Sequence, residues 1–308
     1  MTERLSSVDV LRADQFSTEE IDRILGEARR YEAALDAGEV LDELRGKVLA
    51  TLFFEPSTRT RLSFETAMLR LGGRVISVAE AKSSSAAKGE SLHDTIKTVE
   101  GYADVIVLRH PQIGAAEEAA RATDVPILNA GDGAGQHPTQ SLLDLYTIAK
   151  EQGKVDGLTV ALAGDLKNGR TVHSLADLLA NYGIEFVLVA PEALRMPGEI
   201  VERLRAKGIP VRETELLTDA LPTCDVLYMT RIQRERFDDP TAYERLKDAY
   251  VLTRDLLAAA KESITIMHPL PRVNEIATDV DGHPGAAYFR QAANGVPIRM
   301  ALLAMAAR

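Results

Sequence analysis

Residues Ser57 to Arg61 concentrate three hydroxyl groups and two guanidinium groups in the sequence STRTR. They lie between an apolar run, KVLATLFF, and a segment with helical spacing, SFETAMLRLGG. Pro56 breaks the strand, and Ser57 is well suited to cap a helix. The next backbone N–H groups would then point out of a helix N-terminus, which favours phosphate, and Arg59 adds a bidentate cation. The alternative is an ordinary cap followed by solvent-facing arginines.

Other apolar runs also end in polar residues. The loop after RVISV carries Lys82 and Lys88, and Arg109 follows DVIVL. In the second half of the chain, the runs end in GDLKNGR and TRIQRER. Ligands of parallel sheets bind beyond the carboxyl ends of the strands. If the two sheets face one another, these recurring arginines predict a pocket for a small polyanion, although TRIQRER could equally be a solvated charge run.

Two histidine-proline motifs add candidates. In GQHPTQ, His137 precedes Pro138 at a helix start, and Gln140 lies in the first turn. A histidine at the positive end of a helix dipole stays neutral and can donate a hydrogen bond to a carbonyl, but it could also be a satisfied boundary residue. In MHPLPR, an X-Pro bond can be cis and present backbone carbonyls to a cleft; the alternative is a rigid turn.

Composition excludes several classes of protein. The 308 residues carry a formal net charge of −10, which argues against nucleic acid as the main partner. The single cysteine, Cys224, excludes an intramolecular disulfide and is expected to pack as a small apolar residue. We find no signal peptide and no apolar run of about 18 residues, and therefore expect a cytoplasmic protein without a membrane span. The motifs GxxxxGK[ST], GxGxxG, HExxH and GxSxG are also absent.

Short apolar runs alternate with helical patterns along the whole chain, which predicts an α/β protein with parallel sheets flanked by helices. Strands are expected at residues 47–55, 74–80, 104–110, 125–132, 158–165, 185–191, 225–230 and 263–269. A boundary between two units is expected near residues 137–150. The final apolar helix, within residues 290–308, is too short to be a domain and must pack elsewhere, with the first unit as one candidate.

Seven segments, taken together, resemble the catalytic chain of the aspartate carbamoyltransferase family. In order, they are FFEPSTRTRLSFE, SSSAAKGES, VLRHP, HPTQSLLDLYTI, GDLKNGRTVHSL, MTRIQRERF and MHPLPRVNEI. The resemblance implies a carbamoyl phosphate-binding domain (residues 1–140 and 291–308) and an aspartate-binding domain (141–290). It implies transfer of the carbamoyl group to L-aspartate, giving N-carbamoyl-L-aspartate and phosphate in pyrimidine synthesis, without a metal or organic cofactor.

The resemblance also assigns roles to matching residues. Those expected to contact carbamoyl phosphate are Ser57, Thr58, Arg59, Thr60, Arg109, His137, Gln140, and the backbone carbonyls of Pro269 and Leu270. Within this set, the group expected to bind the carbonyl oxygen is Thr60, Arg109 and His137, whereas Arg59 stabilises the bridging oxygen. The residues expected to receive the aspartate carboxylates are Arg170, Arg231 and Gln233. Glu55 is expected to pair with Arg170 and Arg236 in a closed state.

In the family, a loop carrying Ser84 and Lys88 reaches the active site of a neighbouring subunit, which implies a homotrimer. There Ser84 is expected to contact carbamoyl phosphate, and Lys88 to bind aspartate and to act as one of the catalytic residues. The loop AKSSSAAK has three serines, so that Ser85 is an alternative to Ser84. The sequence leaves open whether regulatory chains or dihydroorotase associate. No residue is an obvious base for the attacking amine, and proton transfer to the leaving phosphate is a hypothesis.

Two alternative functions fit the motifs less well. Ornithine carbamoyltransferases share the phosphate half but carry HCLP and SMG motifs, whereas this chain has Pro269 in HPLP and a RIQRER segment suited to a dicarboxylate. A nonenzymatic anion- or nucleotide-binding module on a Rossmann-like frame would not need the complete set of catalytic residues.

Overall fold

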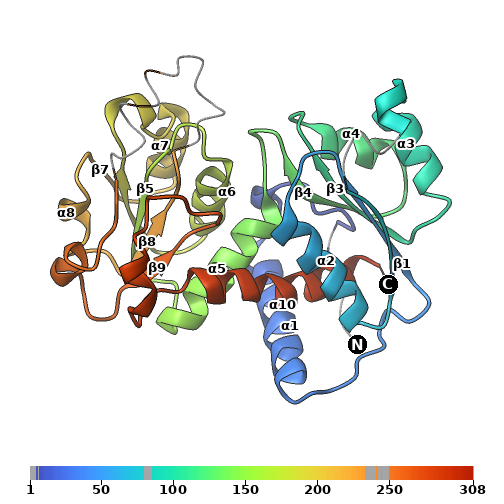
Figure 1. Ribbon diagram of the computed structural model, residues 1–308, viewed down its shortest axis with the longest axis horizontal. Coiled ribbons are helices and arrows are strands. Elements are labelled where there is room, and N and C mark those ends of the chain that lie inside the picture. Colours follow the sequence, from blue (N-terminus) through green and yellow to red (C-terminus); the bar gives the residue numbers. More distant parts are fainter. Residues whose placement is uncertain are drawn as a thin grey trace. The chain divides into compact units, whose positions relative to one another are not determined.

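The computed structural model describes residues 5, 7–79, 85–232, 241, 244 and 250–307, and shows two α/β units (Figure 1). Unit 1 comprises Met1–Leu143 and Asn294–Arg308, and unit 2 comprises Asp144–Ala293. The divisions expected from the sequence were after residues 140 and 290. Each unit contains one parallel sheet with flanking helices, as the alternating pattern predicted.

The sheet of unit 1 has the order β2-β1-β3-β4, and all its strands are parallel. The strands are β1 (Val48–Phe53), β2 (Arg74–Val78), β3 (Val105–His110) and β4 (Ile127–Asp132). The helices of this unit include α1 (Thr18–Asp36), α2 (Thr58–Arg70), α3 (Leu92–Val99) and α4 (Ala115–Ala122), with short 3-10 helices η1 (Ala13–Gln15) and η3 (Ser85–Lys88).

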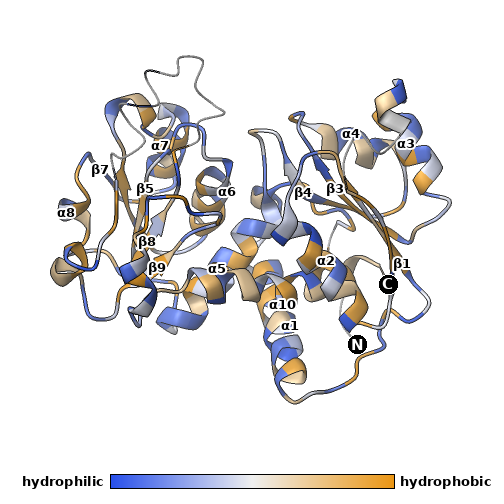
Figure 2. Cartoon of the chain, in the orientation of Figure 1, coloured by the Kyte–Doolittle hydropathy of each residue, from blue (hydrophilic) through white to orange (hydrophobic). Residues whose placement is uncertain are grey.

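Burial explains the strand pattern of unit 1. β1 and β3 lie inside the sheet and read as nearly continuous apolar runs, because parallel strands covered by helices on both faces have no solvent side. The edge strand β2 is half-buried or exposed along its length. Figure 2, coloured by hydropathy, shows mainly hydrophobic residues along the strands.

The start of the chain extends this sheet and leads into α1. Val10 forms an isolated parallel bridge with Leu128 of β4. Before α1, the hydroxyl of Ser17 accepts the N–H of Glu20, and the Glu20 carboxylate accepts the N–H of Ser17, both at 3.2 Å. These two contacts form a capping box, which the sequence STEE indicates at a helix start.

The sheet of unit 2 has the order β7-β6-β5-β8-β9 and is also parallel. Its strands are β5 (Thr159–Ala163), β6 (Glu185–Val189), β7 (Val211–Thr214), β8 (Val226–Met229) and β9 (Thr265–Met267). Its helices include α6 (Arg170–Leu179), α7 (Gly198–Ala206) and α8 (Leu217–Ala220), with η4 (Glu192–Leu194), η6 (Leu256–Ala259) and η7 (Thr278–Gly282). The segment PTAYERLKDAY (residues 240–250), whose pattern predicts a helix, lies largely outside the described residues.

Strand β7 was not predicted from the sequence. It is an edge strand of four residues, VRET, in which Arg212 and Glu213 are exposed and the two end residues are half-buried. A short edge strand needs no apolar run, and the pattern therefore gave no signal.

Two helices contribute residues to both units. These are α5 (Pro138–Gln152) and α10 (Tyr288–Ala306). In unit 1, Arg299 of α10 donates to the Ser63 hydroxyl at 2.7 Å and lies over the Phe64 ring of α2. The C-terminal helix therefore packs on the first unit, as expected.

Candidate functional site

The turn between β1 and α2 carries the STRTR segment. Ser57 occupies the N-cap position of α2, but its side chain accepts no N–H bond from the helix and instead donates to the hydroxyl of Thr60 at 2.9 Å. The predicted position of the cap is right, and the expected side-chain contact is wrong. Because the Ser57 hydroxyl is used elsewhere, the first N–H groups of α2 are left for another acceptor, and an anion suits that position.

The two arginines of this segment differ. Arg59 is exposed, and partial desolvation lowers the pKa of its guanidinium, which still remains a cation near neutrality. Arg61 lies 3.6 Å from the Glu65 carboxylate one turn along α2. Glu65 also accepts a hydrogen bond from Thr51 of β1 at 3.0 Å, so Arg61 belongs to a structural contact between helix and sheet.

Arg109 ends the apolar part of β3 and is 7% exposed. Its guanidinium donates to the carbonyl of Ala130 on β4 at 3.0 Å and to the Glu55 carboxylate, after β1, at 2.7 Å. The cation is therefore held between three adjacent strands. Glu55 was expected to pair with Arg170 and Arg236. In the structure its carboxylate contacts Arg109, and Arg236 lies outside the described residues, so the pairing expected for a closed state stays a prediction.

The loop from β4 to α5 precedes His137, and Asp132 organises it. The buried Asp132 carboxylate accepts the N–H groups of Gln136 at 2.6 Å and Gly114 at 2.8 Å. A Cβ at Gly135 would lie 2.9 Å from the same carboxylate, which explains a glycine there. Asp132 was not among the candidates predicted from the sequence. It could have been found as a carboxylate that lies between glycines at the end of a strand.

His137 and Gln140 are both buried at the start of α5. The carbonyl of His137 accepts the N–H of Gln140 at 3.0 Å and opens the helix. Thus the structure brings the unit 1 candidates to the carboxyl ends of β1, β3 and β4, which are neighbours in one sheet. Lys88 is exposed at the end of η3, and Ser84 lies outside the described residues.

In unit 2, the candidates follow β5 and β8, which are adjacent strands. Arg170 begins α6 and Arg231 follows Thr230, and both arginines are half-buried. Gly164 has a φ of +119°, and a Cβ there would lie 2.2 Å from the carbonyl oxygen of Thr230. The two strand ends can therefore approach only with glycine at this position. Gln233 lies outside the described residues.

The loop after β5 is held by polar contacts. Asp165 accepts the N–H of Asn168 at 3.0 Å, and His173 contacts the carbonyl of Leu166 through Nε2 at 2.7 Å. Burial lowers the pKa of His173, so the neutral imidazole donates to that carbonyl. These contacts fix the approach to Arg170.

The segment after β9 contains a cis Leu270–Pro271 bond, which confirms the expectation that an X-Pro bond in this motif is cis. Leu270 has a φ of +53°, a left-handed conformation that costs a residue with a Cβ about 1–2 kcal/mol. The Nδ1 atom of His268 accepts the Leu270 N–H at 2.8 Å and holds this conformation. Pro269 and Leu270 are both half-buried.

Other features of the described residues lie apart from these strand ends. Burial raises the pKa of the Cys224 thiol to about 12, which fits its predicted role in packing. No cluster of three His, Cys, Asp or Glu side chains suited to a metal occurs in the described part of the chain, and no described helix is long and apolar enough to span a membrane.

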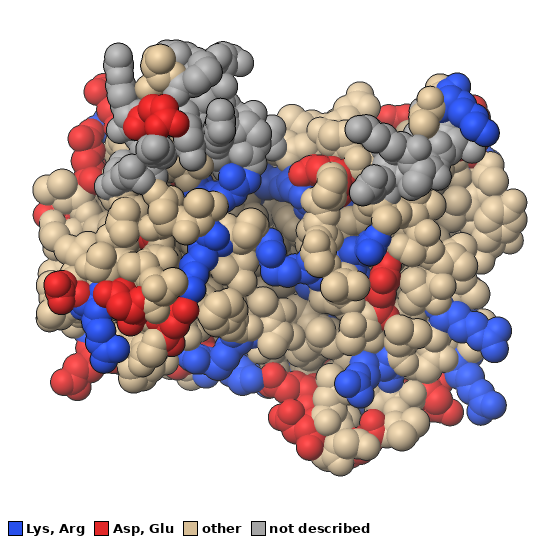
Figure 3. All heavy atoms as spheres, viewed as in Figure 1, with Lys and Arg blue, Asp and Glu red and all other residues tan. Residues whose placement is uncertain are grey.

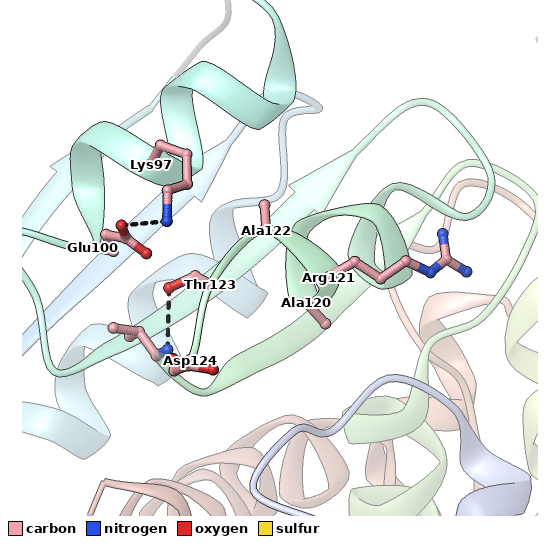
Figure 4. Close-up of a pocket in the computed structure, with 8 residues that line it drawn as sticks. Lys97, Glu100, Ala120, Arg121, Ala122, Thr123 and Asp124 are labelled. Atoms are coloured by element: carbon pink, nitrogen blue, oxygen red, sulfur yellow. Dashed lines mark hydrogen bonds and ion pairs between the residues drawn. The ribbon is translucent and has the colours of Figure 1, made fainter.

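An open depression of about 440 Å³ lies between the C-terminal ends of α3 and α4 (Figure 4). It is lined by side chains of both signs, including an ion pair between Lys97 and Glu100 at 2.6 Å. Val125, just before β4, also lines it, which places the depression at the amino end of that strand. The candidate residues lie at the carboxyl ends. Figure 3 shows both acidic and basic side chains on the face that it draws.

Comparisons with known proteins cover nearly the whole chain. The carbamoyl-P binding domain model of the aspartate/ornithine carbamoyltransferases matches residues 9–150, and the corresponding Asp/Orn binding domain model matches residues 156–306. The aspartate carbamoyltransferase catalytic subunit of Thermococcus kodakarensis is 58% identical over 297 residues, 96% of each chain. That of Methanopyrus kandleri is 56% identical over 296 residues, again 96% of each chain.

Solved structures agree with this similarity. The catalytic subunit of M. Jannaschii aspartate transcarbamoylase superposes with a TM-score of 0.92 at 53% identity, covering 97% of this chain and 98% of that one. Aspartate transcarbamoylase from Trypanosoma cruzi in complex with carbamoyl phosphate gives a TM-score of 0.92 at 46% identity, covering 96% and 95%.

Proposed function

The chain belongs to the aspartate/ornithine carbamoyltransferase family, and from this premise we propose that it transfers the carbamoyl group of carbamoyl phosphate to the α-amino group of L-aspartate. The products are N-carbamoyl-L-aspartate and phosphate, in de novo pyrimidine synthesis. The observation that carries this proposal is the 58% identity, over 96% of the chain, with catalytic subunits named aspartate carbamoyltransferase. Pro269 in HPLP favours aspartate over ornithine.

Unit 1 is proposed to bind carbamoyl phosphate. The N–H groups at the start of α2 and the cation of Arg59 suit the phosphate, and the fixed guanidinium of Arg109 suits an oxygen that gains negative charge. The residues proposed to contact carbamoyl phosphate in this unit are Ser57, Thr58, Arg59, Thr60, Arg109, His137 and Gln140. From unit 2, the backbone carbonyls of Pro269 and Leu270 are proposed to accept hydrogen bonds from the NH2 group of the substrate.

Unit 2 is proposed to bind L-aspartate. Arg170 and Arg231 follow neighbouring strands, and a guanidinium matches a carboxylate with two parallel hydrogen bonds. Gln233 is assigned to the same substrate, and Glu55 with Arg236 to domain closure, from the family resemblance.

The proposed chemistry needs stabilisation of charge more than acid-base catalysis. The amine of aspartate attacks the carbamoyl carbon, negative charge grows on the carbonyl oxygen, and the C–O bond to phosphate then breaks. Donors held in place before the reaction stabilise that charge without reorganisation. Binding both anionic substrates together lowers the entropic part of the barrier. The proton of the amine is proposed to pass to the departing phosphate.

The assembly is proposed to be a homotrimer in which Ser84 or Ser85, together with Lys88, enters the site of a neighbouring subunit. The description "catalytic subunit" of the relatives makes regulatory chains one candidate partner, and dihydroorotase is another. We also propose a cytoplasmic location, because a lone, buried cysteine suits a reducing compartment.

The experiment is a turnover assay with carbamoyl phosphate and either L-aspartate or L-ornithine, applied to the wild type and to Arg59→Ala. We expect turnover with aspartate only, and a roughly 100- to 1000-fold lower kcat for the variant, because a cation that stabilises transition-state charge is lost. Arg70→Ala, in the last turn of the same helix, is the matched control and should keep wild-type turnover. Carbamoylation of ornithine alone would refute the proposed substrate, and near-normal turnover of Arg59→Ala would refute the role of Arg59.

A further inference from the structure

A series of buried hydrogen bonds in unit 2 leads to the segment after β9. The fully buried Asp144 carboxylate of α5 accepts the hydroxyl of Tyr228 on β8 at 2.8 Å and the side-chain N–H of Gln291 on α10 at 2.6 Å. The side-chain oxygen of Gln291 accepts the backbone N–H of His268 at 2.9 Å. Since Gln291 donates at one end and accepts at the other, its amide has a single orientation.

The imidazole of His268 continues the series. Its Nδ1 accepts the Leu270 N–H at 2.8 Å, so the proton lies on Nε2, which donates to Glu275 at 2.6 Å. The other carboxylate oxygen of Glu275 accepts the N–H groups of Val273 and Asn274, both at 3.1 Å. His268 is 1% exposed and Glu275 is 4% exposed. The ring is therefore fixed at both nitrogens.

The contact with Leu270 has a consequence for Pro269. The Leu270 N–H and the Pro269 carbonyl belong to one peptide unit, which is planar and trans, unlike the following Leu270–Pro271 bond. In a trans peptide the N–H and C=O bonds point in opposite directions. The His268 ring therefore sets the direction of the Pro269 carbonyl, which points away from it.

We propose that Gln291 and His268 are positioning residues that make the enzyme select carbamoyl phosphate over acyl phosphates without an NH2 group, such as acetyl phosphate. This inference rests on the proposed function, in which the Pro269 carbonyl receives a hydrogen bond from the carbamoyl NH2 group. A fixed carbonyl accepts from NH2, but a methyl group leaves it without a partner. Such an unpaired polar group is what rejects an analogue.

The test uses Gln291→Met, which keeps a similar volume and removes the hydrogen bonds to Asp144 and His268. Calorimetry on the assembled protein would measure Kd for carbamoyl phosphate, acetyl phosphate and inorganic phosphate. For the wild type, we expect at least roughly tenfold tighter binding of carbamoyl phosphate than of acetyl phosphate. In the variant this ratio should fall towards one, with the other two affinities unchanged. A purely structural defect would weaken all three ligands alike.

Two control variants test whether the effect depends on the contact between Gln291 and His268. Arg290→Gln changes the adjacent residue of α10, whose guanidinium pairs with Glu151 at 2.8 Å, and should leave the ratio unchanged. Tyr228→Phe removes a bond to the same Asp144 carboxylate but spares the contact between Gln291 and His268. It should lower stability without changing the ratio.

A second pair of variants decides the question if Gln291→Met fails to fold. The side-chain oxygen of His268→Asn can replace Nδ1 as acceptor for Leu270, whereas His268→Phe offers none. We expect His268→Asn to keep most of the selectivity for carbamoyl phosphate and His268→Phe to lose it. If the wild type turns over carbamoyl phosphate and aspartate but His268→Asn and His268→Phe show the same selectivity, the inference is overturned while the proposed function stands. If the wild type transfers no carbamoyl group to aspartate, the proposed function itself fails.

Discussion

Arg109 shows how the fold holds a cationic side chain in place at the end of a strand, ready to interact with a negatively charged ligand. Its guanidinium is nearly buried and contacts a backbone carbonyl of β4 and the carboxylate of Glu55. An anionic ligand at this point would meet a cation that already has an anionic partner. Glu55 therefore both holds Arg109 in place and competes with the ligand for its charge.

Glu55→Gln is expected to tighten binding of inorganic phosphate. The amide oxygen can still accept from Arg109, but the competing charge is gone, so we expect a roughly three- to tenfold lower Kd. Calorimetric titration with phosphate measures this. Glu27→Gln removes the same charge from α1 and should leave the Kd unchanged. Turnover of Glu55→Gln should nevertheless fall, because the same carboxylate is proposed to act in domain closure. Unchanged or weaker phosphate binding would contradict the competition.

At the scale of elements, the close approach of β5 and β8 at their carboxyl ends depends on Gly164. Gly164→Ala would place a Cβ 2.2 Å from the Thr230 carbonyl oxygen, and the strand ends would have to separate. We expect a loss of roughly 3 kcal/mol or more in the free energy of unfolding, measured by denaturant titration. The KM for aspartate should rise as well, because Arg231 follows Thr230 in the chain.

Gly208→Ala separates two causes of destabilisation, the left-handed backbone conformation and the close approach of the strand ends. Gly208 also has a left-handed φ, +81°, but a methyl group at this position would lie within 4 Å of no atom beyond its chain neighbours. Only the backbone cost of about 1–2 kcal/mol therefore applies. Equal destabilisation by the two substitutions would show that conformation, and not the approach of the strands, explains Gly164.

The sequence predicted the elements whose signals are local. The buried strands β1 and β3 are apolar runs, and the arginines follow them, so both the sheet and the edge that bears the candidates could be predicted. Strand β7 gave no such signal because its exposed edge tolerates Arg212 and Glu213. The contact between Asp144 and Gln291 joins residues 147 positions apart, and no periodicity indicates such a pair.

At the scale of the whole molecule, each unit has its own sheet and core, and α5 and α10 contribute residues to both. The candidate residues are correspondingly divided. The turn between β1 and α2 and Arg109 belong to unit 1, whereas Arg170, Arg231 and the Pro269 carbonyl belong to unit 2. Lys88 is exposed in unit 1, and its proposed role lies in another subunit. The assembly can therefore be tested separately from the fold.

Mixing Arg59→Ala with Lys88→Ala tests whether sites are shared between subunits. If each site combines Arg59 of one chain with Lys88 of its neighbour, a cyclic trimer containing both variants has one site with both residues intact. Random assembly at equal concentrations should then restore about a quarter of wild-type turnover, although each variant alone is nearly inactive. The variants would be unfolded together, refolded and assayed, with light scattering to measure the mass of the assembly. Separately refolded and then combined variants are the control and should stay inactive if trimers do not exchange chains. No recovery in co-refolded trimers would show that Arg59 and Lys88 act within the same chain. If Lys88→Ala alone keeps wild-type turnover, Lys88 is dispensable and its proposed role is refuted.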